Sequence, residues 1–300
     1  RNVSIGNALQ VNLTLSSNFM LNFYADPEII RSISVGGTAL TAREWEGKNV
    51  YSVPFYAQSA ADSITFTVVA FIDGEEYELS LDFSVLKYAE KLLASEYSED
   101  AKLLAKAAIA YVKEAYKYAN KDVADYTLPE ALSAFSTEGV VSQTAIGHID
   151  NLTSAIRAIN LSLTEEVKIY LHIASGYTGK VTVDGVTHNV INGLIDGVQG
   201  ATIIAIGDKR AKELYTREFT VIAEADGKDA ETASFTLADY VADDTSDCRP
   251  LLDALYTYTY YATDYNDRYP DYENPGDEPD VPDIPESDED DDKWDLPWDM

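Results

Sequence analysis

The sequence has one cysteine, three histidines and no long apolar run, and these shortages exclude several kinds of protein. Cys248 has no second cysteine for an intrachain disulfide, and alone it cannot build a thiolate metal site. No apolar stretch approaches the roughly 18 residues of a membrane span, so we expect no membrane insertion. His148, His172 and His188 lack metal-binding spacing, and we expect neither a metal nor a cofactor.

Basic residues are also scarce, with 22 Lys and Arg against 52 Asp and Glu, which gives a net charge of −30. A phosphate backbone would be repelled, so we expect no nucleic-acid partner. Hydrophobic residues make up 46% of the chain, which is enough for a sizeable core. The chain begins at Arg1 rather than Met, and we expect a mature product or an excised part of a longer protein.

Catalytic signatures are missing as well. There is no G-x-S-x-G nucleophile motif, and the segment Gly176–Lys180 lacks the spacing of a phosphate-binding loop and is interpreted as a turn. Among so many acids, chance alone brings carboxylates together, and spacing in sequence does not define a glycosidase pair. We therefore predict a protein that is not an enzyme.

The C-terminal end differs in composition from the rest. Residues 271–300 contain 14 acids and one base, and six of the ten prolines lie from Pro270 onward. Proline interrupts helices and central strands, and like charges repel along the chain. We interpret residues 270–300 as an acidic, extended tail, although Trp294 and Trp298 would not be needed in a solvated spacer.

An internal repeat organises residues 1–269. Four strand-like segments of the first half match four of the second in the same order, and two of these pairs are followed by Asp-Gly or lead into glycine turns. The matched segments are Val11–Leu15 with Val167–Leu171, Ile33–Gly37 with Val181–Gly185, Phe66–Ala70 with Phe219–Ala223, and Phe83–Val85 with Phe235–Leu237. Asp73-Gly74 and Asp226-Gly227 each predict a hairpin.

Each half then becomes helical. The same apolar stripe at steps of 3, 4, 4 and 3 residues occurs twice, in Leu104, Ala107, Tyr111, Ala115 and Tyr118, and in Leu251, Ala254, Tyr258, Ala262 and Tyr265. A shorter helix is expected before each one, over about 85–94 in the first half and cut short around 242–246 in the second.

Strands followed by helices predict an α+β fold made of two tandem modules, each a small, mostly antiparallel β layer or sandwich followed by a helical hairpin. We place the first module at residues 1–125, a connector at 126–144, the second module at 145–269 and the tail at 270–300. Tyr111 and Tyr258 should then occupy equivalent buried places, and no sheet should cross between the halves.

Both stripes, together with Phe83 and Tyr88 and with Phe235 and Tyr240, resemble a known kind of module. The chain is similar to β-plus-helical-hairpin modules of large secreted or cell-wall-attached proteins of gut and rumen Firmicutes. That resemblance implies an extracellular, non-catalytic module, of a kind often found beside carbohydrate-binding or adhesive regions.

One contrast between the repeats suggests a binding site. Lys113 and Glu114 of the first long helix correspond to Tyr260 and Tyr261 of the second, and Tyr269 follows just beyond. Tyrosine suits both sugar stacking and protein interfaces, because it combines a large ring with a hydroxyl group. We predict Tyr260, Tyr261 and Tyr269 as binding residues, with the rings of Tyr260 and Tyr261 exposed. The alternative is that these rings pack against a neighbouring domain or the tail.

With these features, the resemblance to the Firmicutes modules implies a secreted or cell-wall-associated adhesion protein of a gut bacterium. Its partner would be a host or microbial macromolecule, such as a glycoprotein, an immunoglobulin or a glycan. The alternatives are a carbohydrate-binding accessory module of a polysaccharide-degrading system and a self-assembling surface fibre subunit, for which self-association is expected.

Overall fold

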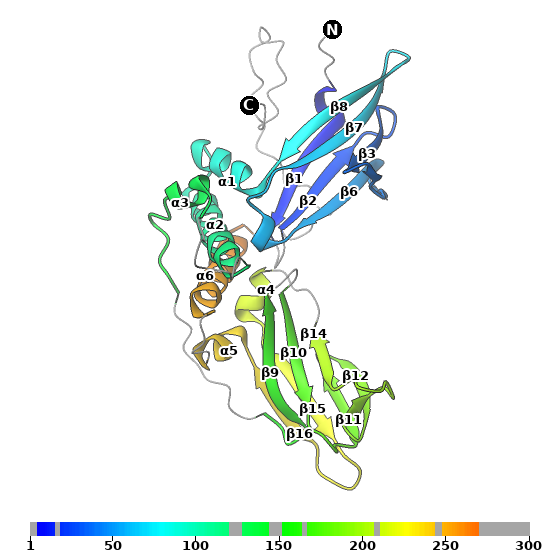
Figure 1. The fold of residues 1–300 in the computed structure, drawn as a ribbon, viewed down its shortest axis with the longest axis vertical. Coiled ribbons are helices and arrows are strands. Elements are labelled where there is room, and N and C mark those ends of the chain that lie inside the picture. Colours follow the sequence, from blue (N-terminus) through cyan, green and yellow to red (C-terminus); the bar gives the residue numbers. More distant parts are fainter. Residues whose placement is uncertain are drawn as a thin grey trace.

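The computed structural model describes residues 5–15, 19–119, 128–143, 152–163, 167–206, 211–243 and 248–269. The predicted acidic tail, His148 and parts of the connector lie outside these residues. Within them the chain forms two β-sandwiches joined by a layer of helices (Figure 1). The predicted α+β class is therefore confirmed, as four antiparallel sheets plus helices.

The first sandwich pairs a sheet of order β1-β2-β6-β5 with a sheet of order β4-β3-β7-β8. Its strands are β1 (Leu9–Leu15), β2 (Phe19–Ala25), β3 (Ile30–Val35), β4 (Thr38–Ala39), β5 (Arg43–Trp45), β6 (Lys48–Phe55), β7 (Ile64–Ile72) and β8 (Glu75–Phe83). Every second side chain of β7 is buried, as the alternating sequence predicts. Phe23 and Phe66 meet between the two sheets in an edge-to-face contact, with ring centroids 4.9 Å apart.

The second sandwich pairs a sheet of order β14-β10-β9 with a sheet of order β13-β12-β11-β15-β16. Its strands are β9 (Ile156–Leu163), β10 (Val167–Ile173), β11 (Gly179–Val183), β12 (Val186–Ile191), β13 (Leu194–Ile195), β14 (Ile203–Ile206), β15 (Phe219–Glu224) and β16 (Glu231–Phe235). Phe219 and Phe235 stack inside it at 5.2 Å. In the described part of the chain no sheet combines strands of both halves, as expected.

The predicted hairpins are present, but they differ in their turns. Asp73 and Gly74 form a two-residue loop between β7 and β8, and both have positive φ (53° and 86°). That geometry requires residues that tolerate the left-handed region, which explains the Asp-Gly pair. Asp226-Gly227 instead lies within a longer loop, since β15 ends at Glu224 and β16 begins at Glu231.

The helices are α1 (Val85–Ala94), α2 (Glu99–Ala119), α3 (Glu130–Ala134), α4 (Ala211–Thr216), α5 (Leu237–Asp243) and α6 (Arg249–Arg268). The bounds of α1 agree with the prediction, and the Ser84 hydroxyl caps it by accepting a hydrogen bond from the Lys87 amide. Helix α5 ends at Asp243, within the region where the sequence predicted a shortened helix.

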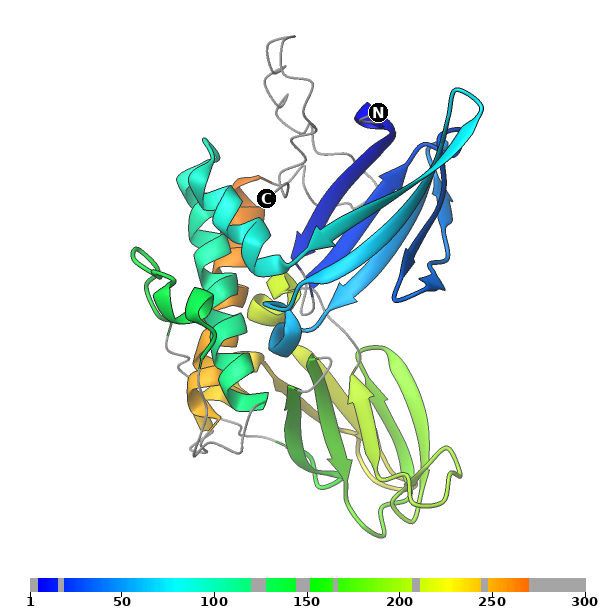
Figure 2. The same cartoon turned by 45° about the horizontal axis from the view of Figure 1, so that its top comes forward.

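Helix α2 packs most extensively against α6 rather than against its hairpin neighbour α1. The two long helices run side by side along one side of the molecule, and the two sandwiches project from this layer (Figures 1 and 2). They are antiparallel, because Arg268 at the end of α6 pairs with Asp100 at the start of α2. Helices from the two halves of the sequence therefore form one layer.

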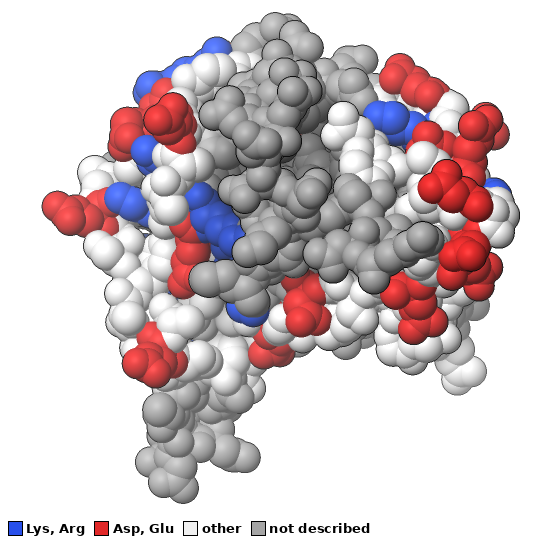
Figure 3. Space-filling view, turned by 90° about the horizontal axis from the view of Figure 1, so that it is seen from above, with Lys and Arg blue, Asp and Glu red and all other residues white. Residues whose placement is uncertain are grey.

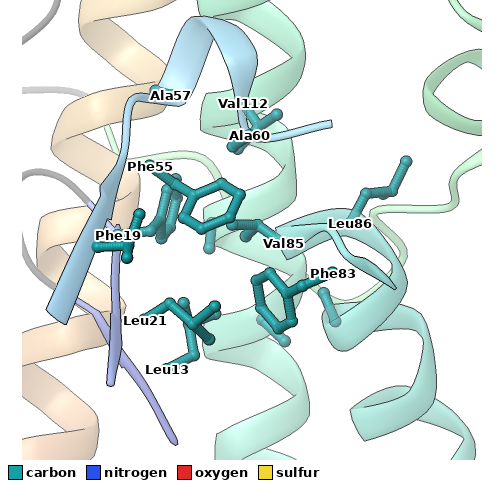
Figure 4. Close-up of a cluster of buried hydrophobic side chains, with 14 of the residues drawn as sticks. Leu13, Phe19, Leu21, Phe55, Ala57, Ala60, Phe83, Val85, Leu86 and Val112 are labelled. Carbon is teal, nitrogen blue, oxygen red and sulfur yellow. The ribbon is translucent and has the colours of Figure 1, made fainter. Parts of the chain in front are cut away.

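The core of the first sandwich continues into this layer. Phe19, Phe55 and Phe83 point from their strands toward α2, where Val112 is fully buried (Figure 4). A short 3-10 turn, Ala57–Ser59, also packs on α2. Burying large apolar side chains contributes roughly 1.5–3 kcal/mol each, so this joint holds the sandwich firmly on the helix.

One of the strand matches made from the sequence is wrong. Val11–Leu15 lies in the edge strand β1, whereas Val167–Leu171 lies in the central strand β10, between β9 and β14. In the sheet β1-β2-β6-β5, the inner strand next to β1 is β2. The error arose because β1 and β2 share the same alternating pattern, and pattern alone does not tell an edge strand from a central one.

Candidate functional site

The tyrosines of α6 divide among three surroundings, according to the face of the helix that each occupies. Tyr258 faces α2, Tyr256 and Tyr260 face α4, and Tyr265 and Tyr269 lie at the C-terminal end. Because α6 turns once in 3.6 residues, neighbouring tyrosines in the sequence project in different directions. The cluster seen in the sequence is therefore not one surface.

Tyr258 is a core residue. Its ring stacks on Tyr111 of α2, with centroids 5.7 Å apart and planes 10° apart, and it lies 5.9 Å from Phe19 of β2. Both tyrosines are buried, as predicted. Burial disfavours the charged phenolate and raises the pKa of both Tyr111 and Tyr258.

Tyr261 does not have the exposed ring that the sequence predicted. Its side chain is only 7% exposed, and its hydroxyl oxygen accepts a hydrogen bond of 2.8 Å from the Val141 amide. The next turn of α6 makes a similar contact, because Thr257 Oγ1 accepts from the Gln143 amide at 2.9 Å. The expectation of exposure is wrong here because the connector, whose fold was not predicted, lies over this face of α6.

Tyr260 is half-buried. Its ring meets Tyr215 of α4 edge-on at 5.4 Å and Tyr261 at 5.2 Å. Tyr215 also contacts Tyr256 at 5.2 Å. Tyr256 and Tyr260 therefore pack within the protein. Their neighbour is α4 of the same half of the chain, rather than the neighbouring domain or the tail of the alternative interpretation.

Tyr269, the third predicted residue, lies where the start of α2 meets the end of α6. Its ring is 4.7 Å from that of Tyr265, at an angle of 36°, and its hydroxyl donates to Asp100 Oδ2 at 3.3 Å. Arg268 bonds the other oxygen of Asp100 at 3.0 Å, and about half of the Arg268 side chain is exposed. We call Asp100, Tyr265, Arg268 and Tyr269 the helix-end cluster.

Two further tyrosines lie near this cluster. Tyr97, just before α2, is 44% exposed. Tyr88 of α1 is partly buried, and its pKa is raised to about 12 by desolvation and then by the proximity of Tyr97 and Tyr265. The exposed Tyr97 ring and the partly exposed ring of Tyr269 give the cluster an aromatic surface beside a carboxylate and a guanidinium.

The sequence did not predict the other members of this cluster. Asp100 and Arg268 are 168 positions apart and carry no local motif. Only the antiparallel pairing of α2 and α6 brings them together, and the matching stripes of these helices were the one sequence signal for that pairing.

The histidines in the described strands have separate polar partners. His172 Nε2 lies 2.8 Å from Asn160 Nδ2, and His188 Nδ1 lies 3.2 Å from Asp196 Oδ2. The Asn189 amide and His188 both bond the Asp196 carboxylate and lower its pKa. Across the residues that the structure describes, no group of three or more His, Cys, Asp or Glu side chains is arranged to hold a metal ion.

Ser175 and Gly176 form a turn, as interpreted from the sequence, in the link that joins β10 of one sheet to β11 of the other. Gly179 and Lys180 are already the first two residues of β11. At Gly179, a Cβ atom would lie 2.1 Å from the Glu224 carbonyl oxygen. The glycine at this position is therefore required for close packing of two backbones rather than for phosphate binding.

Comparisons with known proteins give no assignment: no family profile, no curated protein and no solved structure matches the chain significantly. None of the described helices is long and apolar enough to span a membrane.

Proposed function

We propose that the protein is a non-catalytic binding protein of a bacterial cell surface, and that the helix-end cluster is its recognition site. The observation that carries this proposal is the meeting of partly exposed tyrosine rings with the Asp100–Arg268 ion pair at one end of the helical layer. Tyrosine and arginine are the residues most enriched where proteins bind other macromolecules.

The same proposal includes two tandem modules, at residues 1–125 and 145–269, with a connector at 126–144 and a tail at 270–300. Three observations support it. Each half ends in helices after its last strand, each has a sheet in which its second strand lies inside, and each contributes one long helix to the shared layer. Tyr111 and Tyr258, matched in the repeat, contact each other in that layer.

In this arrangement the helical layer is anchored on the first sandwich. Helices α2 and α6 bury one another's apolar stripes. Helix α2 also covers the end of the first sandwich's core that is formed by Phe19, Phe55 and Phe83. A binding site on the layer would be rigid, and rigid sites lose less conformational entropy when they bind.

The chemistry of the helix-end cluster suits either a glycan or a protein partner. Sugar rings stack on aromatic faces, while their hydroxyl groups bond to carboxylates and guanidinium groups. A protein partner would use the same Tyr and Arg side chains as anchors. Secretion or attachment to the cell wall, as in the Firmicutes modules that the sequence resembles, would expose the cluster to such partners.

The proposal is tested by binding of the whole chain to a glycan array and to a panel of glycoproteins and immunoglobulins. Tyr269→Ala should weaken any binding by tenfold or more, because an aromatic anchor contributes about 2 kcal/mol. Tyr118→Ala, at the other end of α2, is the control and should leave binding unchanged. Equal losses in both variants, or binding by neither the wild type nor the variants, would contradict the assignment of the site.

A carbohydrate-binding accessory role is the second candidate, favoured by the pairing of Tyr269 with Asp100. Asp100→Asn keeps the size of the side chain but removes its charge. If the ligand is a glycan, this variant should weaken glycan-array signals and leave binding to deglycosylated proteins unaltered.

A further inference from the structure

Strand β14 is an edge strand without charged residues, and it exposes a large apolar side chain, Ile203. It pairs with β10 on one side, and in the described part of the chain no strand pairs with its other side. The sequence around it, residues 197–206, contains no Asp, Glu, Lys or Arg. We call this segment the edge strip.

The edge strip is exposed as well as uncharged. Val198 is 58% exposed and Ile203 is 43% exposed, and Ala205 also faces solvent. Ile191, which is 62% exposed, lies at the same end of the sandwich as Ile203. Ile203 pairs with His172 near the end of β10, and Val190 beside Ile191 pairs with Gly179, the first residue of the next strand, β11. Clustered exposed apolar residues are typical of interaction surfaces.

The backbone of β14 also has hydrogen-bonding groups available on its open side. The Ile173 amide donates to the Thr202 carbonyl at 2.9 Å, so this pair is a hydrogen-bonded one. Pairs alternate along an antiparallel ladder, so Ile204 and Ile206 also bond to β10, whereas Ile203 and Ala205 turn their N–H and C=O groups away from it. Such groups form a template for another strand.

The first sandwich shows what covers the corresponding edge. Its strand β6 lies beside the central strand β2, and its outer side is covered by the antiparallel strand β5, with Arg43 paired to Val50. In the second sandwich the short strand β13 pairs instead with β12, in the opposite sheet. That difference leaves β14 open where β6 is covered.

We infer that β14 is a self-association site, at which the β14 strand of a second copy of this chain adds antiparallel to the first. Pairing Ile203 with Ala205 of the second copy places Ile204 on the two-fold axis, and each such pair exchanges both N–H···O bonds. The contact is isologous, which is the commonest arrangement in soluble oligomers. This inference is independent of the helix-end cluster.

Charge and exposure together make β14 the edge at which a second copy can approach. The edge strand β1 also lacks charged residues, but none of its described large apolar side chains is exposed, whereas Ile203 of β14 is. Each copy carries a net charge of −30, so most faces of the molecule would repel their own equivalents. Acidic side chains predominate on the face seen from above (Figure 3), and the edge strand β8 exposes Glu76, Glu78 and Asp82. Pairing β8 with itself would place these carboxylates close together, whereas the edge strip brings no charges into contact.

Sedimentation analysis of the whole chain from micromolar to millimolar concentration tests the inference. The average mass should rise from the 33.0 kDa of one chain toward twice that value. Salt screens the repulsion between the two acidic copies, so association should tighten as sodium chloride is added. A mass that stays at one chain throughout, or association that weakens with salt, would overturn the inference.

Two variants locate the contact. Ala205→Lys places like charges across the two-fold axis and should weaken association by at least tenfold. Ala205→Pro removes the outward N–H without adding charge and should weaken it as well, because proline is tolerated on an edge strand whose N–H faces solvent.

The matched control is Ser234→Lys, on the exposed face of β16, an edge strand of the same sandwich. It changes the net charge as Ala205→Lys does, and it should leave the association constant unchanged or slightly increased. Circular dichroism and melting temperatures establish that all three variants fold. Equal weakening by Ser234→Lys and Ala205→Lys, or undiminished association of both Ala205 variants, would place the contact elsewhere and refute the assignment.

Discussion

The ring of Tyr111 lies flat against the ring of Tyr258, 5.7 Å away, at the centre of the helical layer. One ring comes from α2 and the other from α6, 147 residues later, and both are buried. They occupy the same position in two identical stripes of the sequence, so the two halves of the chain meet through matched residues.

Replacing either ring should strongly destabilise the fold. Tyr258→Ala removes a large, fully buried side chain and should lower the free energy of unfolding by about 3–5 kcal/mol, with a similar loss for Tyr111→Ala. Urea unfolding followed by circular dichroism measures both. In the double variant the two losses should not add, and the coupling should be about 0.5–1.5 kcal/mol. Tyr97→Ala, at an exposed ring, is the control; a comparable loss there would contradict the core role assigned to the pair.

Exchanging the two α6 tyrosines for the residues of the first half should have unequal effects. Tyr261→Glu buries a carboxylate beneath the connector and removes the acceptor of the Val141 amide, so it should destabilise the protein by about 2–4 kcal/mol. Tyr260→Lys, at a half-buried position, should cost less, because a lysine can extend its ammonium group to water. Thermal unfolding of the two single variants distinguishes these effects, and a harmless Tyr261→Glu would show that the ring is not enclosed.

Stability should fall at alkaline pH. Burial raises the pKa of Tyr88 to about 12 from the 10.0 of an exposed phenol, and it raises the pKa of Tyr111 and Tyr258 as well. The unfolded chain therefore releases these protons first, so the stability they contribute is complete below pH 10 and is lost as the pH rises through the folded values. Denaturant midpoints measured across this range should decrease, and Tyr88→Phe should make the decrease shallower. Midpoints that stay constant above pH 10 would show that these phenols ionise equally in the folded and unfolded states.

Gly179→Ala should distort the second sandwich. The added methyl group would overlap the Glu224 carbonyl, so the two backbones must separate, at a cost of about 1–3 kcal/mol. Gly227→Ala is a suitable comparison, because its φ is 73° but the space around it is open, so only the conformational cost of about 1 kcal/mol applies. Melting temperatures of the two variants should rank accordingly, and the reverse order would refute the close approach.

Local sequence signals predicted local structure well. Asp73-Gly74 specifies its two-residue turn, and the range 85–94 was expected for α1. In the structure Ser84 and Ser98 cap α1 and α2 by accepting backbone amides. These features depend on a few neighbouring residues, so one sequence contains enough information to find them.

Contacts distant in sequence were harder to predict. The apolar stripe of α2 could equally have faced α1 alone, and nothing near Tyr261 indicates that residues 141–143 would cover it. The helix-end cluster depends on the antiparallel direction of two helices, which periodicity does not determine. Val11–Leu15 was matched with the segment in β10, although the next strand, β2, holds the corresponding place. Choosing between the two requires the order of strands in each sheet.

The pairing of α2 with α6 also determines when folding can be completed during synthesis. The first sandwich and α2 leave the ribosome long before α6. The apolar face of α2 around Tyr111 therefore stays exposed until α6, the last helix of the described chain, has been synthesised. Contacts so far apart in sequence form late and slowly. A nascent chain held up before Arg249 would present that apolar face to chaperones or to other chains.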